Sequence, residues 1–200
     1  NADVIIICNI DQGTGEIKLV SVFRDTYLSV SDNGLYNKIN QAYFLGGPEQ
    51  AVEALNRNLD LQIDDFATFN WKAVVDAVNI LGGVDVELSK AEFYYINAYI
   101  TETVEATGVG SYQLKQAGLN HLDGVQAVAY ARLRKMDTDF ARTERQREII
   151  DLCFQKLKKS DFAVVNNVME AVFPQILSSV TIDDIIPAAR NLTKYTIADT

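Results

Sequence analysis

Residues 4–23, VIIICNIDQGTGEIKLVSVF, decide the fold class of the chain. The run Val4–Ile10 is almost continuously apolar, which is typical of a strand covered on both faces. Turn residues follow at Asp11–Gly15, and Glu16–Phe23 then alternates between polar and apolar residues and is rich in β-branched side chains. Two such runs separated by turn residues predict an antiparallel β-hairpin.

Beyond the hairpin, strands and helices alternate. Helical spacing of apolar residues, with Pro48 in the first turn of the first helix, predicts helices over Glu49–Asn58, Trp71–Leu81 and about Arg142–Lys159, and two more from Phe162 and Asp183. Asp123 and Gln126 form a capping box that starts another helix. Further strands are expected over Ile63–Asn70 and Val84–Leu88, the second of them buried, with Gly82-Gly83 stopping the helix before it. The pattern weakens between Ser89 and Asn120, which indicates an irregular insertion. We therefore expect one α/β domain over residues 1–200, with a mixed central sheet flanked by helices in an α/β/α sandwich.

Composition excludes several classes of protein. The chain has 200 residues, 48% apolar and 22% charged, which suits a single globular domain and excludes a disordered or collagen-like chain. Its net charge of -9 is opposite in sign to that of a general nucleic-acid binder, so no nucleic-acid partner is expected.

Cys8, in a buried strand, and Cys153 are expected to be packed thiols, and His121, the single histidine, is expected to be structural. No apolar run approaches the roughly 20 residues of a membrane span, so this chain is expected to carry no anchor or signal peptide.

The charge distribution is uneven. Residues 132–147, RLRKMDTDFARTERQR, hold six basic residues against three acidic ones, and five of the eight arginines of the chain. Arginine forks suit bidentate recognition of phosphate or carboxylate groups. Arg142, Arg145 and Gln146 share one helical face by their spacing, and Arg132 and Arg134 end the preceding helix. The loop Asp137–Asp139 is expected to fold the two groups toward each other. A salt-bridged surface hairpin explains the same pattern, so the spacing alone leaves both alternatives open.

Two further charged positions stand near the predicted hairpin. Arg24-Asp25 follows the second strand, at the kind of strand end where α/β proteins place ligand groups, although an ordinary loop ion pair explains it equally well. Asp3 lies at the mouth of the first strand, and as a lone acid it indicates little.

Six segments in the same order resemble the LytR-CpsA-Psr family. They are ADVIII, SVFRD, KINQAY, LGGVDV, LNHLDGVQAVAYARLRK and DTDFARTERQ, which together span nearly the whole chain. The Tyr-Ala-Arg-x-Arg-Lys segment followed by Asp-x-Asp-Phe-x-Arg-x-x-Arg-Gln is the most specific part. The resemblance implies a membrane-anchored enzyme, mostly of Gram-positive bacteria, that acts outside the cell. Such enzymes transfer an anionic glycan, of the teichoic acid or capsular polysaccharide type, from a polyprenyl-pyrophosphate carrier onto peptidoglycan, with Mg²⁺.

The resemblance also assigns roles to individual residues. Arg24 is similar to the arginine of the family's Ser-x-Pro-Arg-Asp motif, and Arg132 and Arg134 are similar to its Arg-x-Arg, which makes these three the implied catalytic residues. The implied pyrophosphate-binding residues are Arg24, Arg132, Arg134, Arg142, Arg145 and Gln146. Asp3 is similar to a metal-holding aspartate, and its implied ligand is Mg²⁺. Several arginines and a cation suit a diphosphate, whose charge they would neutralise.

Three departures from the family pattern accompany the resemblance. Phe23 stands where the family has proline, and Asn1-Ala2, consistent with a remnant of an expression tag, replaces the Arg-Ser before the metal aspartate. The family's second metal aspartate and its transmembrane helix lie upstream of this motif. We therefore expect the chain to be the soluble part of a longer anchored enzyme, with an incomplete metal site and impaired activity as it stands.

In the implied reaction, a glycan hydroxyl attacks the sugar-proximal phosphorus and releases polyprenyl phosphate, while the arginines and Mg²⁺ stabilise the developing charge. Two other functions are compatible with the same residues. One rival is a non-catalytic module that binds polyprenyl phosphates and senses the state of the envelope, in line with the family's older description as transcriptional attenuators. Another is a polyprenyl-pyrophosphate hydrolase, with water as the acceptor.

Overall fold

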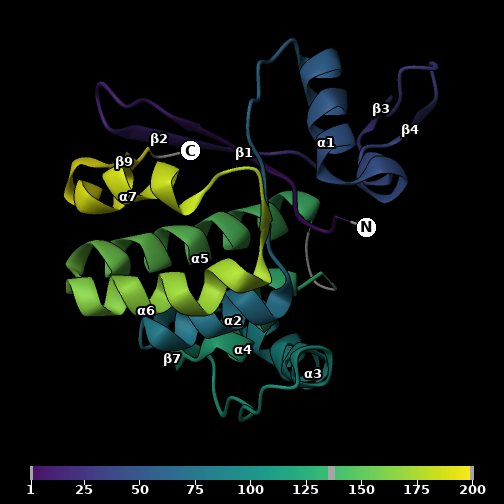
Figure 1. Cartoon of the computed structure of the whole chain (residues 1–200). Helices are drawn as coiled ribbons and strands as arrows, with labels where there is room; N and C mark the ends of the chain where they lie inside the picture. Colours follow the sequence, from purple (N-terminus) through teal and green to yellow (C-terminus); the bar gives the residue numbers. More distant parts are fainter. Residues whose placement is uncertain (1, 135–137, 199–200) are drawn as a thin grey trace. The chain divides into compact units, whose positions relative to one another are not determined.

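The computed structural model describes residues 2–134 and 138–198, which form two compact units (Figure 1). Unit 1 contains residues up to 68 and from 177 onward, and unit 2 contains residues 69–176. Among the described residues, no helix combines the length and the apolar composition that crossing a bilayer demands.

Unit 1 is built on the expected hairpin. β1 (Ile6–Ile10) pairs antiparallel with β2 (Glu16–Ser21), and β2 pairs in parallel with β9 (Thr196–Ile197), so this sheet is mixed. The turn is fixed by the Asp11 carboxylate, which accepts hydrogen bonds from the amides of Gly13 and Thr14 at 2.7 and 3.1 Å. The hairpin is confirmed, but the covering of β1 on both faces and the burial of Cys8 are wrong, because residues 8–10 are exposed.

The remaining strands and helices of unit 1 surround a small apolar core. They are β3 (Tyr27–Ser29), β4 (Tyr36–Lys38), α1 (Asn40–Leu59), β5 (Ala67–Thr68), β8 (Leu177–Ser178), α7 (Ile182–Arg190) and the short 3₁₀ helix η2 (Leu192–Lys194). α1 is kinked at Gly46-Gly47, and the regular helix resumes at Pro48, where the sequence predicts its first turn. The strand expected over Ile63–Asn70 shrinks to β5, which pairs antiparallel with β8.

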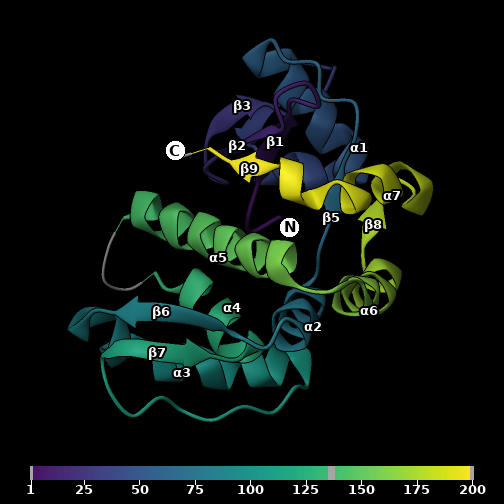
Figure 2. The same cartoon turned by 90° about the vertical axis from the view of Figure 1, so that its left-hand side faces the viewer.

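Unit 2 is mainly helical. Its elements are α2 (Trp71–Ile80), β6 (Val84–Leu88), α3 (Lys90–Thr107), β7 (Gly118–Leu122), α4 (Gly124–Arg132), α5 (Asp139–Lys159), α6 (Phe162–Val172) and the 3₁₀ helix η1 (Phe173–Gln175). Figure 2 shows β6 and β7 as neighbouring antiparallel strands, and their pairing joins Val86 to Asn120. Val84, Val86 and Leu88 of β6 are buried whereas Asp85 and Glu87 are exposed, so this strand is buried on one face only.

The segment expected to be irregular contains a long helix. α3 begins with a capping box in which the Ser89 hydroxyl accepts from the amide of Glu92 and the Glu92 carboxylate accepts from the amide of Ser89. It ends at Gly108, whose φ of 70° gives the left-handed cap that favours glycine. The expectation of an irregular segment is wrong for α3 and confirmed for residues 108–117, which form neither helix nor strand. α3 buries only a narrow stripe, so its apolar periodicity is weak.

α4 packs unusually closely on α2. A Cβ built on Gly124 would stand 2.1 Å from the carbonyl oxygen of Val75, and the Gly124 amide donates to the Asn79 side chain at 2.7 Å. The capping box of Asp123 and Gln126 starts α4 as the sequence predicts. Glycine at this position therefore lets the helix that ends at Arg132 rest directly on the backbone of α2.

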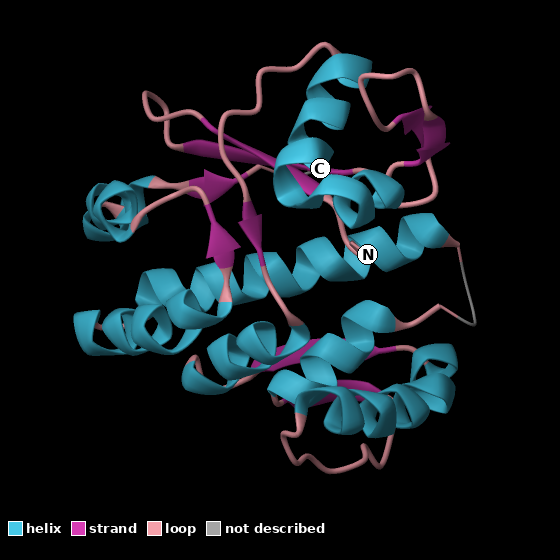
Figure 3. Cartoon of the chain, turned by 45° about the vertical axis from the view of Figure 1, so that its right-hand side comes forward, coloured by secondary structure: helices cyan, strands magenta, loops and turns pink. Residues whose placement is uncertain are grey.

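The α/β class is confirmed, with helices more extensive than strands (Figure 3). The described strands form one mixed sheet of three strands and three sheets of two strands. The single domain over residues 1–200 stays a prediction, since the chain leaves unit 1 after residue 68 and returns to it at residue 177.

Candidate functional site

The predicted arginine group is assembled in unit 2, where α4 ends and α5 begins. α4 stops at Arg132, and the following Leu133 has extended backbone and a fully buried side chain. α5 starts at Asp139, capped by the Thr138 hydroxyl. Five of the predicted residues lie at this junction, namely Arg132, Arg134, Arg142, Arg145 and Gln146. Lys135 and Asp137, which belong to the same predicted segment, lie outside the described residues.

Arg132 is oriented by side chains of two other helices. Its Nη1 donates to the Thr103 hydroxyl at 2.9 Å, and its guanidinium lies 5.6 Å from the centre of the Trp71 ring. Its Nη2 is 3.7 Å from a carboxylate oxygen of Glu102. With 24% of its side chain exposed, Arg132 is held in place but open to solvent on one side.

Arg134 and Arg142 share one carboxylate. Asp139 Oδ1 lies 3.5 Å from Nη2 of Arg134 and 3.0 Å from Nη1 of Arg142. The Arg134 side chain is 39% exposed, whereas that of Arg142 is only 6% exposed. An anion arriving from solvent therefore meets Arg134 before Arg142.

Arg145 and Gln146 are buried and turned toward the end of α4. Arg145 Nη2 donates to the carbonyl oxygen of Leu133 at 2.8 Å, and Gln146 Nε2 donates to that of Ala131 at 3.3 Å. Arg145 Nη1 is also 3.5 Å from Glu92. Among the described residues, ion pairs join these four arginines to the carboxylates of Asp139, Glu102 and Glu92.

Tyr130, in α4, contacts two side chains of α5 at the same junction. Its hydroxyl donates to Glu148 at 2.8 Å, and its ring centre is 5.9 Å from the Arg145 guanidinium. Burial, followed by the hydrogen bond to Glu148, raises the pKa of Tyr130 far above its usual range. A phenolate here would be both desolvated and next to a carboxylate.

The raised pKa of Tyr130 gives a testable pH dependence. The folded state holds the phenol proton more tightly than the unfolded state, so this contribution to stability is complete below about pH 10 and is lost as the pH rises above that value. We expect the free energy of unfolding of Tyr130→Phe, measured in urea between pH 8 and 11, to fall less steeply with pH than that of the parent. At neutral pH the variant should lose about 1 kcal/mol with the hydrogen bond. Parallel curves would contradict this assignment.

The other predicted charged residues lie in unit 1. Arg24 Nη1 donates to a carboxylate oxygen of Asp3, and its Nε is 3.8 Å from Asp25. Lys38 Nζ lies 2.9 Å from the other oxygen of Asp25. The loop ion pair that the sequence left open is therefore present, and it extends into a chain of alternating charges from Asp3 to Lys38.

The donor set of Asp3 suits a magnesium ion only in part. The described residues contain no group of three or more carboxylate, histidine or cysteine side chains that would form a complete protein cage. Mg²⁺ is commonly held by one or two carboxylates together with substrate phosphates and water. Asp3, half-exposed and paired on one side with Arg24, is a chemically suitable single donor of this kind.

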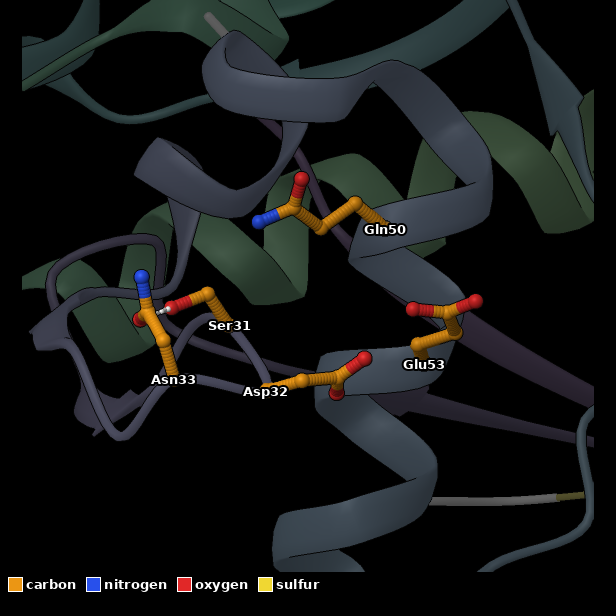
Figure 4. A pocket seen from close by; sticks show the side chains of 5 residues that line it. All are labelled: Ser31, Asp32, Asn33, Gln50 and Glu53. Atoms are coloured by element: carbon orange, nitrogen blue, oxygen red, sulfur yellow. Dashed lines mark hydrogen bonds between the residues drawn. The ribbon is translucent and has the colours of Figure 1, made fainter.

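A separate pocket in unit 1 has a different character (Figure 4). It is lined by Ser31, Asp32 and Asn33 of the loop after β3 and by Gln50 and Glu53 of α1. Its two charged side chains are both acidic, so it does not suit a diphosphate. None of the residues predicted from the sequence lines it.

Sequence reasoning missed the residues that orient the arginines. Glu92, Glu102 and Thr103 all belong to α3, and Trp71 begins α2. The spacing Ser89-x-x-Glu92 is a capping-box signal that could have revealed α3. It would not have shown which arginine each of these side chains meets.

Comparisons with known proteins identify the family of the chain. The model of the LytR_cpsA_psr family matches residues 1–199. An uncharacterised protein of Staphylococcus aureus is 32% identical over 172 residues, which make up 86% of this chain and 40% of that protein. The polyisoprenyl-teichoic acid–peptidoglycan teichoic acid transferase TagU of Halalkalibacterium halodurans is 29% identical, over 91% of this chain and 56% of the relative.

A solved structure extends the likeness to three dimensions. The structure of TagT bound to LIIa-WTA superposes with a TM-score of 0.77 at 26% identity, covering 98% of this chain and 71% of that one. The chain spans about half the length of the curated relatives it matches. Because the family model covers nearly every residue, the chain belongs to the LytR_cpsA_psr family.

Proposed function

We propose that the protein transfers an anionic cell-wall glycan, of the teichoic acid or capsular polysaccharide type, from a polyprenyl-pyrophosphate carrier to peptidoglycan. The observation that carries the proposal is the arginine cluster where α4 meets α5. In this cluster Arg132 and Arg134 are partly exposed, whereas Arg142 and Arg145 are buried. The names of the TagU relatives and of the ligand-bound TagT structure supply the substrate class.

The proposed reaction is a phosphoryl transfer to a sugar hydroxyl. The acceptor oxygen forms a bond to the sugar-proximal phosphorus and its proton passes to solvent water. The bridging P–O bond breaks, and polyprenyl phosphate leaves with the electron pair of that bond. Negative charge grows on the leaving oxygens, where preorganised guanidiniums stabilise it. Arg132 and Arg134 are proposed to do this directly, and the family resemblance adds Arg142, Arg145 and Gln146 to the diphosphate-binding set. Arg24 in unit 1 is proposed as a further catalytic arginine.

Magnesium is the proposed cofactor, with Asp3 as a ligand. When bound, the ion neutralises charge on the diphosphate. The Arg24 side chain holds the Asp3 carboxylate in one orientation, which leaves its second oxygen for the ion. The proposed site of action is the extracytoplasmic face of the cell membrane, where a lipid-linked donor and peptidoglycan are both within reach of the enzyme.

The decisive experiment supplies the full-length protein with a radiolabelled lipid-linked glycan, peptidoglycan and Mg²⁺. We expect label in the peptidoglycan fraction and free polyprenyl phosphate, with both lost on addition of EDTA or in Asp3→Asn. Release of glycan phosphate into solution without label in peptidoglycan would show a hydrolase instead. Tight binding of the lipid without any turnover would show a non-catalytic sensor. Either result would overturn the transferase proposal.

A further inference from the structure

The end of α4 is held by side chains of α5. The last carbonyl groups of a helix have no partners within the helix and need others. Here the carbonyl oxygens of Ala131 and Leu133 accept from Gln146 and Arg145 at 3.3 and 2.8 Å. These two carbonyls flank Arg132, and the buried Leu133 side chain lies between Arg132 and Arg134. The main chain that presents both exposed arginines is thus tied to α5 on either side of Arg132.

The Arg145 side chain is buried, and its contacts are with other residues of the protein. Only 5% of its side chain is exposed, against 24% for Arg132 and 39% for Arg134. One of its terminal nitrogens donates to Leu133, the other faces Glu92, and the guanidinium lies over the Tyr130 ring. A buried guanidinium with these contacts orients its protein partners and does not bind a ligand.

Glu92 links this arrangement to a third helix. One oxygen of its carboxylate accepts from the amide of Ser89 at 2.8 Å and so caps α3, while the other lies 3.5 Å from Arg145 Nη1. The Glu92 side chain is 13% exposed, so its attraction to Arg145 is little screened by water. The first turn of α3 therefore fixes Arg145, and Arg145 in turn fixes the end of α4.

We infer that Glu92, Arg145 and Gln146 form a clamp that sets the positions of Arg132 and Arg134. Arg145 is then a positioning residue, which takes it out of the diphosphate-binding set that the family resemblance implies. Glu92 becomes a residue required for diphosphate affinity although it carries the same sign of charge as the ligand. The inference deepens the proposed function and rests on it, because it assumes that Arg132 and Arg134 bind a diphosphate.

Two glutamate variants of α3 test the clamp. Glu92→Gln retains the cap of α3, because glutamine also serves in a capping box, but it removes the charge that faces Arg145. Glu105→Gln removes the same charge from an exposed position of the same helix and is the matched control. With geranyl diphosphate as the probe in calorimetry, we expect Glu92→Gln to bind roughly tenfold more weakly, as displaced binding groups do. Glu105→Gln should bind as tightly as the parent.

If Arg145 contacted the diphosphate itself, removing Glu92 would free it and raise the affinity. An unchanged or raised affinity in Glu92→Gln therefore overturns the clamp. Arg145→Lys gives a second measure that keeps the charge but loses the fork, and it too should weaken binding although the net charge is unchanged. Parent affinity in this variant would contradict the inference.

Hydrogen exchange separates this inference from the proposed function. In the absence of any ligand, the amides of Leu133 and Arg134 should exchange faster in Glu92→Gln than in the parent, and at the parent rate in Glu105→Gln. A parent that fails to bind geranyl diphosphate would overturn the proposed function, and the exchange rates would still decide whether the clamp exists. Equal exchange in all three proteins would overturn the clamp alone.

Discussion

Replacing Arg134 with alanine is expected to weaken diphosphate binding by about 1.5–3 kcal/mol, the usual loss for a charge-assisted contact. This corresponds to roughly 10- to 150-fold in the dissociation constant. Arg132→Ala should cost at least as much, because it removes both the guanidinium and its contact with the Trp71 ring. Transfer activity should fall further than binding, since the charge on the leaving oxygens exceeds that of the bound donor.

Calorimetry with geranyl diphosphate and the labelled-glycan assay measure the two effects. Arg134 gives the cleaner variant, because its half-exposed side chain contributes little to packing. Arg190→Ala, an exposed arginine in the last turn of α7, is the matched control and should leave affinity and transfer unchanged. Equal affinity of Arg134→Ala and the parent would remove Arg134 from the binding site.

Replacing Gly124 with alanine is expected to destabilise the protein strongly, because Gly124 lies at the surface where α4 packs on α2. The added Cβ would stand 2.1 Å from the carbonyl oxygen of Val75 and 2.8 Å from its Cα, and backbone atoms cannot turn aside as a flexible side chain does. We expect a loss of about 2–3 kcal/mol, in the upper range for overpacking. For a chain of this size each kcal/mol lowers the melting temperature by roughly 2–4 °C.

Gly110→Ala is the control for this change. An added Cβ at Gly110 meets nothing within 4 Å, so the melting temperature should be unchanged or slightly raised. Gly124→Ala should also weaken geranyl diphosphate binding, since α4 must move away from α2 and takes Arg132 with it. A melting temperature equal to that of the parent would mean that α4 does not pack on α2 as described.

Local signals in the sequence were sufficient to predict most of the longer helices and strands. The turn residues Asp11–Gly15, the capping pair Asp123 and Gln126, and Pro48 each act within a few residues, so their effects could be read directly. α3 was missed because its only clear signal, Ser89 with Glu92, lies at its start, while its buried stripe is narrow. The burial of β1 was overestimated because an apolar composition does not say which neighbours cover a strand.

The candidate site was predictable as a set of residues but not as an arrangement. The sequence placed Arg132, Arg134, Arg142, Arg145 and Gln146 on two successive helices, and the structure brings them to one junction. It could not distinguish exposed from buried arginines, because burial depends on partners that lie far away in the sequence. Thr103 meets Arg132 and Glu92 meets Arg145 only through tertiary packing.

The pairing of β5 with β8 has a consequence for how this protein can change over evolution. Thr68 and Leu177 are register partners, so the chain leaves unit 1 and re-enters it at neighbouring residues. Unit 2 is therefore an insertion with adjoining ends, and a short turn between Thr68 and Leu177 would close unit 1 without it. Recombination at these two points would exchange the segment that carries the arginine cluster and preserve the strand register of unit 1.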